Sequence, residues 1–117
     1  MKRAELLELL SARVLCGEEQ PDNEIYCACG SDMMSDVLAF TKHDAILLTG
    51  LVNNHVMRTA EMMDIQCVLF VRGKKPEKDI IEMAKDADMI LLATEKPMFT
   101  ACGILYTNGL KGGMRGV

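Results

Sequence analysis

The fold class is set by the central segment of the chain, which reads Ala45-Ile46-Leu47-Leu48-Thr49-Gly50-Leu51-Val52-Asn53-Asn54-His55. It opens with an apolar run without alternation, which is typical of a β-strand covered on both faces. Gly50 permits a tight turn after the strand, and Asn53 or Asn54 can cap the N-terminus of a helix. We therefore predict a buried strand over residues 45–48 and a helix over residues 54–63.

The same strand-to-helix pattern recurs twice further along the chain. Residues 65–71 form a second apolar run, and Pro76 suits the first turn of a helix over residues 77–86. A third run covers residues 89–93, and the helix that begins at Pro97 ends before Gly109. Such alternation predicts parallel strands joined by right-handed crossovers. The expected fold is α/β, with a layered, mostly parallel sheet and crossover helices.

The segments that precede this core are shorter. The expected elements are a helix over 2–12, strands over 13–16 and 24–30, and a helix over 33–40. Ser31 and Asp32 are residue types that cap a helix N-terminus, and they come just before the second of these helices. We expect a single domain over residues 1–117, ordered to about residue 110, with a glycine-rich flexible tail over residues 111–117.

Composition excludes several functional classes. Thirteen basic and 17 acidic residues give a net charge of −4, which argues against binding nucleic acid through its phosphates. No apolar run approaches the ~20 residues that a membrane span needs. The chain begins with acidic residues and leucines at helical spacing, not with the apolar stretch of a signal peptide. We expect a cytoplasmic protein that binds neither nucleic acid nor a membrane.

The chain has five cysteines, at Cys16, Cys27, Cys29, Cys67 and Cys102. The odd number and the absence of an export signal indicate reduced thiols. Cys27 and Cys29 lie on one face of a predicted strand, and a C-x-C pair can bind a metal, but no further ligands follow at a recognisable spacing. We expect these side chains to pack in the core and to hold no metal.

The loops that follow the predicted strands meet at the carboxyl edge of the sheet, where such sheets usually bind ligands. The most informative is Arg72-Gly73-Lys74-Lys75, which holds three of the 13 basic residues. It precedes a helix N-terminus, whose free N–H groups and dipole favour anions. The loop is either an anion-binding loop or a solvated basic turn. Its spacing matches no Walker sequence, so nothing in it indicates nucleotide hydrolysis.

The two neighbouring loops complete the candidate site. Asn53 and Asn54 either cap their helix or contact a ligand, and His55 either faces the same cleft or is a surface side chain. The candidate ligand-binding residues are Thr49, Gly50, Asn53, Asn54, His55, Arg72, Gly73, Lys74 and Thr94. The sequence contains no nucleophile motif and no pair of acids placed by a motif, so we expect neither a catalytic set nor a cofactor.

Taken together, these segments resemble the DRTGG domain, from the first helix to about Gly109. The resemblance rests on Gly30–Val37, Ile46–Gly50, Arg58–Met62, Val68–Pro76, and on Thr94, Phe99, Ala101–Gly103 and Leu105–Tyr106. The chain departs from the family at the residues that give it its name. Val52-Asn53-Asn54 stands in place of Asp-Arg-Thr, and Arg72-Gly73 stands in place of the double glycine.

The resemblance implies a fold similar to the N-terminal domain of HPr kinase and to the substrate-binding domain of Mur ligases. Family members are accessory modules beside CBS domains in regulated pyrophosphatases and inside some phosphotransacetylases. Stand-alone versions that look like this chain accompany iron hydrogenase and signalling genes in anaerobic bacteria. The resemblance therefore implies a regulatory, dimer-forming role without catalysis.

These considerations lead to one main hypothesis and two alternatives. The main hypothesis is a non-catalytic regulatory homodimer that binds a small anionic ligand, such as a nucleotide, at the carboxyl ends of the strands. The first alternative is a dimerisation or protein-interaction subunit of a redox or signalling complex, without a small-molecule ligand. The second is a small enzyme.

Overall fold

A single sheet runs through the middle of the protein. The computed structural model describes residues 1–40 and 45–113. The strands in these residues are β1 (Arg13–Cys16), β2 (Cys27–Gly30), β3 (Ala45–Thr49), β4 (Cys67–Phe70), β5 (Ile90–Ala93) and β6 (Lys111–Gly112). They form a six-stranded sheet in the order β1-β5-β4-β3-β2-β6. All neighbours pair in parallel except β1, which runs antiparallel to β5 at one edge.

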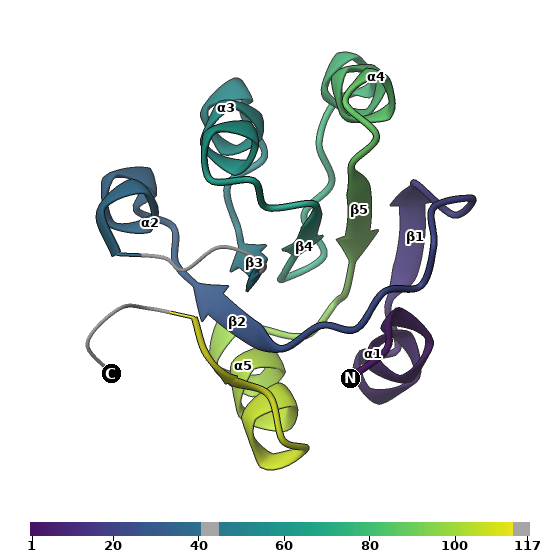
Figure 1. Ribbon diagram of the computed structural model, residues 1–117, viewed down its shortest axis with the longest axis vertical. Coiled ribbons are helices and arrows are strands. Elements are labelled where there is room, and N and C mark those ends of the chain that lie inside the picture. The colour runs from purple at the N-terminus through teal and green to yellow at the C-terminus, as the bar shows by residue number, and fades with distance from the viewer. Residues whose placement is uncertain (41–44, 114–117) are drawn as a thin grey trace.

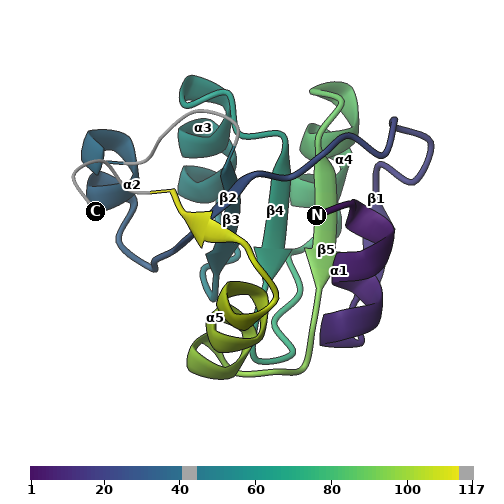
Figure 2. The same ribbon diagram turned by 60° about the horizontal axis from the view of Figure 1, so that its bottom comes forward.

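Helices cover both faces of the sheet and make three layers (Figure 1). The helices are α1 (Arg3–Leu10), α2 (Met34–Phe40), α3 (Asn54–Met62), α4 (Lys78–Asp86) and α5 (Met98–Thr107). α2, α3 and α4 lie on one face, and α1 and α5 lie on the other, which Figure 2 turns toward the viewer. In the described part of the chain, no helix combines the length and the apolar character that crossing a membrane requires.

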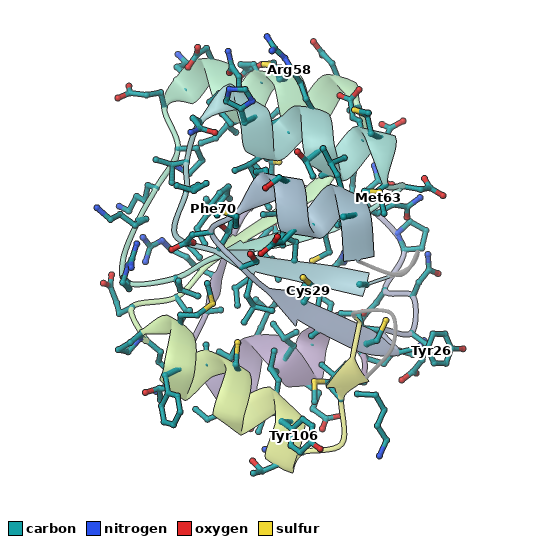
Figure 3. All side chains as sticks on the ribbon, turned by 90° about the vertical axis from the view of Figure 1, so that its left-hand side faces the viewer. Tyr26, Cys29, Arg58, Met63, Phe70 and Tyr106 are labelled. Carbon is teal, nitrogen blue, oxygen red and sulfur yellow. The ribbon has the colours of Figure 1, made fainter. Side chains whose placement is uncertain are left out.

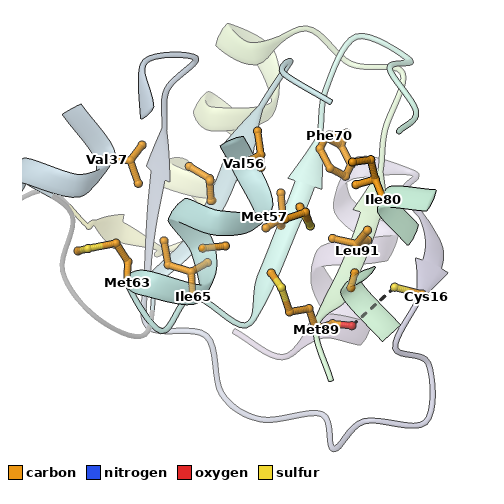
Figure 4. Close-up of a cluster of buried hydrophobic side chains, with 14 of the residues drawn as sticks. Cys16, Val37, Val56, Met57, Met63, Ile65, Phe70, Ile80, Met89 and Leu91 are labelled. Atoms are coloured by element: carbon orange, nitrogen blue, oxygen red, sulfur yellow. Dashed lines mark hydrogen bonds between the residues drawn. The ribbon is translucent and has the colours of Figure 1, made fainter. Parts of the chain in front are cut away.

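The central strands supply both halves of the core because their side chains alternate between the two faces. Every residue of β3 and β4 is buried. Leu47, Val68 and Phe70 pack against α2, α3 and α4, in the cluster that Figure 4 shows. Leu48 and Leu69 belong to the second cluster, beneath α1 and α5. Burial on both faces explains why these strands are continuous apolar runs.

The predicted α/β class, with its layered, mostly parallel sheet, is confirmed. The helices and strands from β3 to α5 begin and end within two residues of the expected positions. The second strand begins at Cys27, later than the expected residue 24, because residues 20–26 leave the sheet and line a cavity.

The first residues of the expected flexible tail, from residue 111, form a short strand. Lys111–Gly112 forms β6, which pairs in parallel with β2, and the Gly113 N–H donates to the Ala28 carbonyl at 2.6 Å. Backbone groups alone form this ladder, so a glycine-rich composition does not prevent it. The rest of the predicted tail, residues 114–117, lies outside the described residues.

Candidate functional site

The loops that follow β2, β3, β4 and β5 meet at the carboxyl edge of the sheet, since these strands are parallel neighbours. Thr49 at the end of β3 stands beside Phe70 of β4, which in turn stands beside Ala93 of β5. This register brings the two predicted ligand loops, after Thr49 and after Phe70, next to each other. The Val71 N–H continues the ladder past β4 by donating to the Thr49 carbonyl at 3.0 Å.

The Asp32 carboxylate lies at the centre of this edge. Its Oδ1 accepts a hydrogen bond from the Thr49 hydroxyl at 3.0 Å and another from the Gly50 N–H at 2.6 Å. Its Oδ2 lies 3.9 Å from Nη2 of Arg72. Asp32 therefore lies between the Gly50 N–H and the Arg72 guanidinium, beside the loop for which the sequence predicted an external anion.

Arg72 and Gly73 have an unusual backbone conformation. Both lie in the left-handed region, with φ of 60° for Arg72 and 70° for Gly73. A residue with a Cβ is strained in this region, by roughly 1–2 kcal/mol. Two hydrogen bonds hold the loop in place: the Arg72 N–H donates to the Lys96 carbonyl and the Gly73 N–H to the Thr94 carbonyl, both at 2.9 Å. The loop thus strongly favours glycine at both positions, yet an arginine occupies the first.

Glycine at position 50 leaves room for the Arg72 side chain. A Cβ at Gly50 would overlap the Arg72 guanidinium, and a Cβ at Gly73 would overlap the Glu95 carboxylate. The guanidinium accordingly lies directly over the β3–α3 turn. Its side chain remains about half exposed, at 47%, and the Asp32 side chain is 43% exposed.

The remaining predicted site residues have separate local partners. Asn53 caps α3 through a hydrogen bond from the His55 N–H to its side-chain oxygen at 3.1 Å. Asn54 and His55 are exposed in the first turn of that helix, and Lys74 is exposed beyond the Arg72 loop. These positions are compatible with ligand contact, and that role stays a prediction.

Thr94 is turned away from the edge. Its side chain is buried, and its hydroxyl donates to the Leu10 carbonyl at the end of α1 at 2.7 Å while accepting from the Lys96 N–H at 3.3 Å. In this arrangement Thr94 ties α1 to the β5–α5 loop.

Sequence reasoning missed Asp32 because it reads as a helix-capping residue. One signal could have identified it: Asp32 follows a predicted parallel strand, so it had to reach the same edge as the other loops. The N–H groups of Gly50, Arg72 and Gly73 all have partners within the protein. The Arg72 guanidinium is a half-exposed donor at this edge, and the exposed Lys74 and Lys75 follow it in the chain.

Three of the cysteines are free thiols with a raised pKa. Burial raises the pKa of Cys67 to about 12, against a smaller opposing effect of the Arg3 charge. Burial also raises the pKa of Cys16, whose thiol donates to the Met89 carbonyl (Figure 4). The pKa of Cys102 is raised by burial and by the neighbouring Cys29. Thiols that are protonated at neutral pH are poor nucleophiles, so these three act as packing residues.

The described residues contain no group of three or more histidine, cysteine, aspartate or glutamate side chains that could hold a metal ion. Cys29 lies in the core and Cys27 is half-buried at the start of β2. This placement matches the expectation that the two side chains pack in the protein.

Comparison with known proteins gives a fold and a family. No curated protein matches the chain. Among solved structures, it is similar to the CBS and DRTGG domains of the regulatory region of Clostridium perfringens pyrophosphatase, crystallised with the activator diadenosine tetraphosphate. The TM-score is 0.70 at 21% identity, over 88% of this chain and 45% of the other, so the chain spans less than half of that structure. The family model of the DRTGG domain matches residues 5–107, and the chain therefore belongs to the DRTGG domain family.

Proposed function

We propose that this protein is a non-catalytic regulatory module that senses a small anionic ligand, such as a nucleotide, at the carboxyl edge of its sheet. The observation that carries the proposal is the Asp32 carboxylate, held by the Thr49 hydroxyl and the Gly50 N–H and facing Arg72 at 3.9 Å. These donors already bind a carboxylate that belongs to the protein. They are equally suited to a phosphate or carboxylate of a ligand.

Sensing follows from competition between the ligand and Asp32. An anion that pairs with Arg72 displaces a contact that is long and solvent-exposed, and such contacts contribute little, about 0–1 kcal/mol. Asp32 lies two residues before α2, and α2 packs against α3. A ligand anion that also takes the Thr49 hydroxyl and the Gly50 N–H releases Asp32, which loosens the β2–α2 loop and changes the surface that α2 presents. This gives ligand binding a structural consequence away from the site.

Two further observations support an anionic ligand. Lys74 and Lys75 are exposed beside Arg72, so the loop attracts negative charge although the chain as a whole carries −4. The similar pyrophosphatase region was crystallised with a nucleotide activator, which fits a nucleotide as the class of ligand. We propose a cytoplasmic location, because the free thiols of Cys16, Cys67 and Cys102 suit a reducing compartment.

The proposal is tested by removing the competing charge. In Asp32→Asn, the side-chain oxygen still accepts from Thr49 and Gly50, but Arg72 loses its internal anion. We expect this variant to bind diadenosine tetraphosphate, ATP or inorganic phosphate several-fold more tightly than the unmodified protein in isothermal titration calorimetry. Asp36→Asn is the matched control, since Asp36 is an exposed acid on α2.

Two results would contradict the proposal. If none of these anions binds either protein, the carboxyl edge is not an anion site. If Asp36→Asn tightens binding as much as Asp32→Asn does, the gain reflects net charge and not competition at Arg72.

A second candidate function, homodimerisation, is favoured by the surface of α5. This ten-residue helix, MFTACGILYT, contains no charged side chain, although 26% of the chain is charged. Phe99 is 90% exposed and Tyr106 is 71% exposed, and Tyr106 projects outward from α5 in Figure 3. Exposed Gly103 lies between them and offers a flat surface. Uncharged, apolar faces of this kind mark interaction sites.

We propose a second copy of the chain as the partner of this face. Two uncharged helices can approach each other without repulsion, even though each chain is acidic overall, and an isologous pair closes the assembly. Light scattering is expected to give twice the monomer mass, and Phe99→Glu is expected to give monomers. The exposed position Thr100→Glu beside it is the control for added charge. A protein that is monomeric before any substitution would contradict this assignment.

A further inference from the structure

A second pair of opposite charges lies along the carboxyl edge, on the other side of the Arg72 loop from Asp32. Arg13, the first residue of β1, comes to this edge because β1 runs antiparallel to β5 and pairs there with Ala93. Its Nη1 lies 3.8 Å from Oε1 of Glu95, which follows β5. The edge therefore carries two arginine–carboxylate pairs, one on each side of the loop after β4.

The two pairs are built in the same way. In each, a glycine leaves the room that a charged side chain occupies: the Arg72 guanidinium lies over Gly50, and the Glu95 carboxylate lies over Gly73. Their nitrogen and oxygen atoms, at 3.8 and 3.9 Å, are farther apart than the about 2.7–2.9 Å of a charge-assisted hydrogen bond. Within residues 1–40 and 45–113, neither guanidinium donates a hydrogen bond to the protein. Both arginines thus keep their donors for another acceptor.

The order of the strands sets the distance between the two arginines. β5 alone separates β1 from β4, so the ends of these strands are about 10 Å apart, twice the spacing of neighbouring strands. The Glu95 carboxylate spans part of this gap, because it faces Arg13 and lies over Gly73, the residue next to Arg72. One small molecule can therefore reach both guanidinium groups when its anionic groups are several ångströms apart.

Other charged side chains surround the two pairs. In the loops after β4 and β5 and in the first turn of α4 they are Lys74, Lys75, Glu77, Lys78, Asp79 and Lys96. All six are at least partly exposed, and none of them forms an ion pair with another described residue. The four lysines add to the attraction of anions without marking one binding position. The two arginines differ from them, because each faces a carboxylate that a ligand can replace.

We propose that the ligand of the carboxyl edge carries two anionic groups, one bound by Arg72 and the other by Arg13. This rests on the proposed function, since it assigns a second contact to the same ligand. The first group replaces the Asp32 carboxylate, and the second replaces the Glu95 carboxylate. Phosphate chains and dicarboxylates share this chemistry. A ligand with a single anionic group can replace only one of the two carboxylates, so the edge discriminates against it.

Calorimetric titration with probes of one and two anionic groups tests this specificity. Inorganic phosphate is compared with tripolyphosphate, and acetate with adipate, so that the two comparisons separate phosphate chains from dicarboxylates. At least one two-group probe should bind to the unmodified protein at least about tenfold more tightly than its one-group counterpart. In Arg13→Gln this ratio should fall to about twofold or less, because the second group loses its charge-assisted hydrogen bonds.

Two further variants separate the second contact from net charge. Glu95→Gln removes the competing carboxylate and should tighten binding of the two-group probe several-fold; in the double variant with Arg13→Gln this gain should disappear. Lys78→Gln is the matched control, since it removes one positive charge from an exposed position at the start of α4. It should weaken the two-group probe less than about twofold. Arg13 is exposed on an edge strand, and Glu95→Gln carries the test if Arg13→Gln does not fold.

The proposal is overturned if Arg13→Gln and Lys78→Gln weaken binding of the two-group probe equally, because net charge then accounts for the effect. It is also overturned if one-group and two-group probes bind the unmodified protein equally tightly. In both cases the one-group probe still responds to Asp32→Asn, so the proposed function survives. If no probe binds any of the proteins, the proposed function fails together with this proposal.

Discussion

The left-handed conformation of Arg72 leads to a prediction about stability: at this position a glycine variant should be more stable than an alanine variant, the reverse of the order in a helix. Its φ of 60° strains any residue with a Cβ, by roughly 1–2 kcal/mol. Arg72→Gly removes this strain, loses about 0.5–1 kcal/mol through the greater freedom of the unfolded chain, and loses about 0–1 kcal/mol with the exposed Asp32 pair. We expect Arg72→Gly to have a free energy of unfolding within about 1 kcal/mol of the unmodified protein.

Arg72→Ala is the comparison that isolates the backbone. It loses the same ion pair but keeps the Cβ, and therefore keeps the strain. Arg72→Gly should thus be more stable than Arg72→Ala by about 1 kcal/mol. At Glu82, an exposed position within α4, the order should reverse, since alanine is favoured over glycine by about 1 kcal/mol in a helix.

Urea unfolding followed by circular dichroism measures these differences, because the chain has no tryptophan for fluorescence. The free energies of unfolding of the two variants in each pair are compared with the same slope of free energy against urea concentration. If Arg72→Ala is as stable as Arg72→Gly, the loop does not hold residue 72 in the left-handed conformation and the reasoning fails. A stable Arg72→Gly protein also provides the material for the anion titration, since it lacks the guanidinium and retains the fold.

Three further predictions concern the thiol, the Thr94 anchor and the β3–α3 turn. The pKa of Cys67 is raised in the folded protein, so the contribution of this thiol to stability is complete below the ordinary thiol pKa and is lost as the pH rises toward 12. Over that pH range the free energy of unfolding, measured by urea titration, should fall by up to roughly 4 kcal/mol because of Cys67. In Cys67→Ala this contribution to the fall should be missing. Thr94→Val should lower the unfolding free energy by about 1–3 kcal/mol by leaving the Leu10 carbonyl without its donor, whereas Thr94→Ser should keep both stability and ligand affinity. Gly50→Ala should displace the Arg72 guanidinium without changing charge, so calorimetry should show weaker anion binding; unchanged affinity would mean that the ligand does not use Arg72 in this position.

The centre of the fold could be predicted because local and global signals agree there. Strands β3, β4 and β5 are apolar runs buried on both faces, and each is followed by a segment of helical period. The two edges of the sheet carry no such signal. β1 pairs antiparallel with β5 across more than 70 residues, as in the pairing of Arg13 with Ala93, and no local pattern encodes a partner so distant. Lys111–Gly112 has the composition of a turn and becomes a strand through backbone hydrogen bonds alone.

The sequence could predict those residues of the candidate site that are brought together by the order of the strands in the sheet. Thr49, Gly50 and Arg72 follow neighbouring parallel strands, and the structure places the Arg72 guanidinium directly over Gly50. The role of Asp32 could not be read from the sequence, because an aspartate before a helix has an adequate local explanation as a cap. The cavity at the amino edge was hidden for a different reason. Its wall, residues 20–26, reads as a polar turn and part of a strand, and only the crossing from β1 to β2 places it over the strand ends.

The loop at Arg72 and Gly73 explains how one substitution can change the chemistry of this fold without changing its shape. The loop geometry, with two successive left-handed residues fixed by the Thr94 and Lys96 carbonyls, suits the double glycine of the family signature. Two glycines would meet that geometry without strain but would bring no charge. An arginine at the first position accepts roughly 1–2 kcal/mol of strain and places a cation over the turn after β3. Strain that is kept where glycine would relieve it points to a use for the side chain. Asp32 is the anion that this cation meets within the protein, at 3.9 Å, and it lies in the loop between β2 and α2.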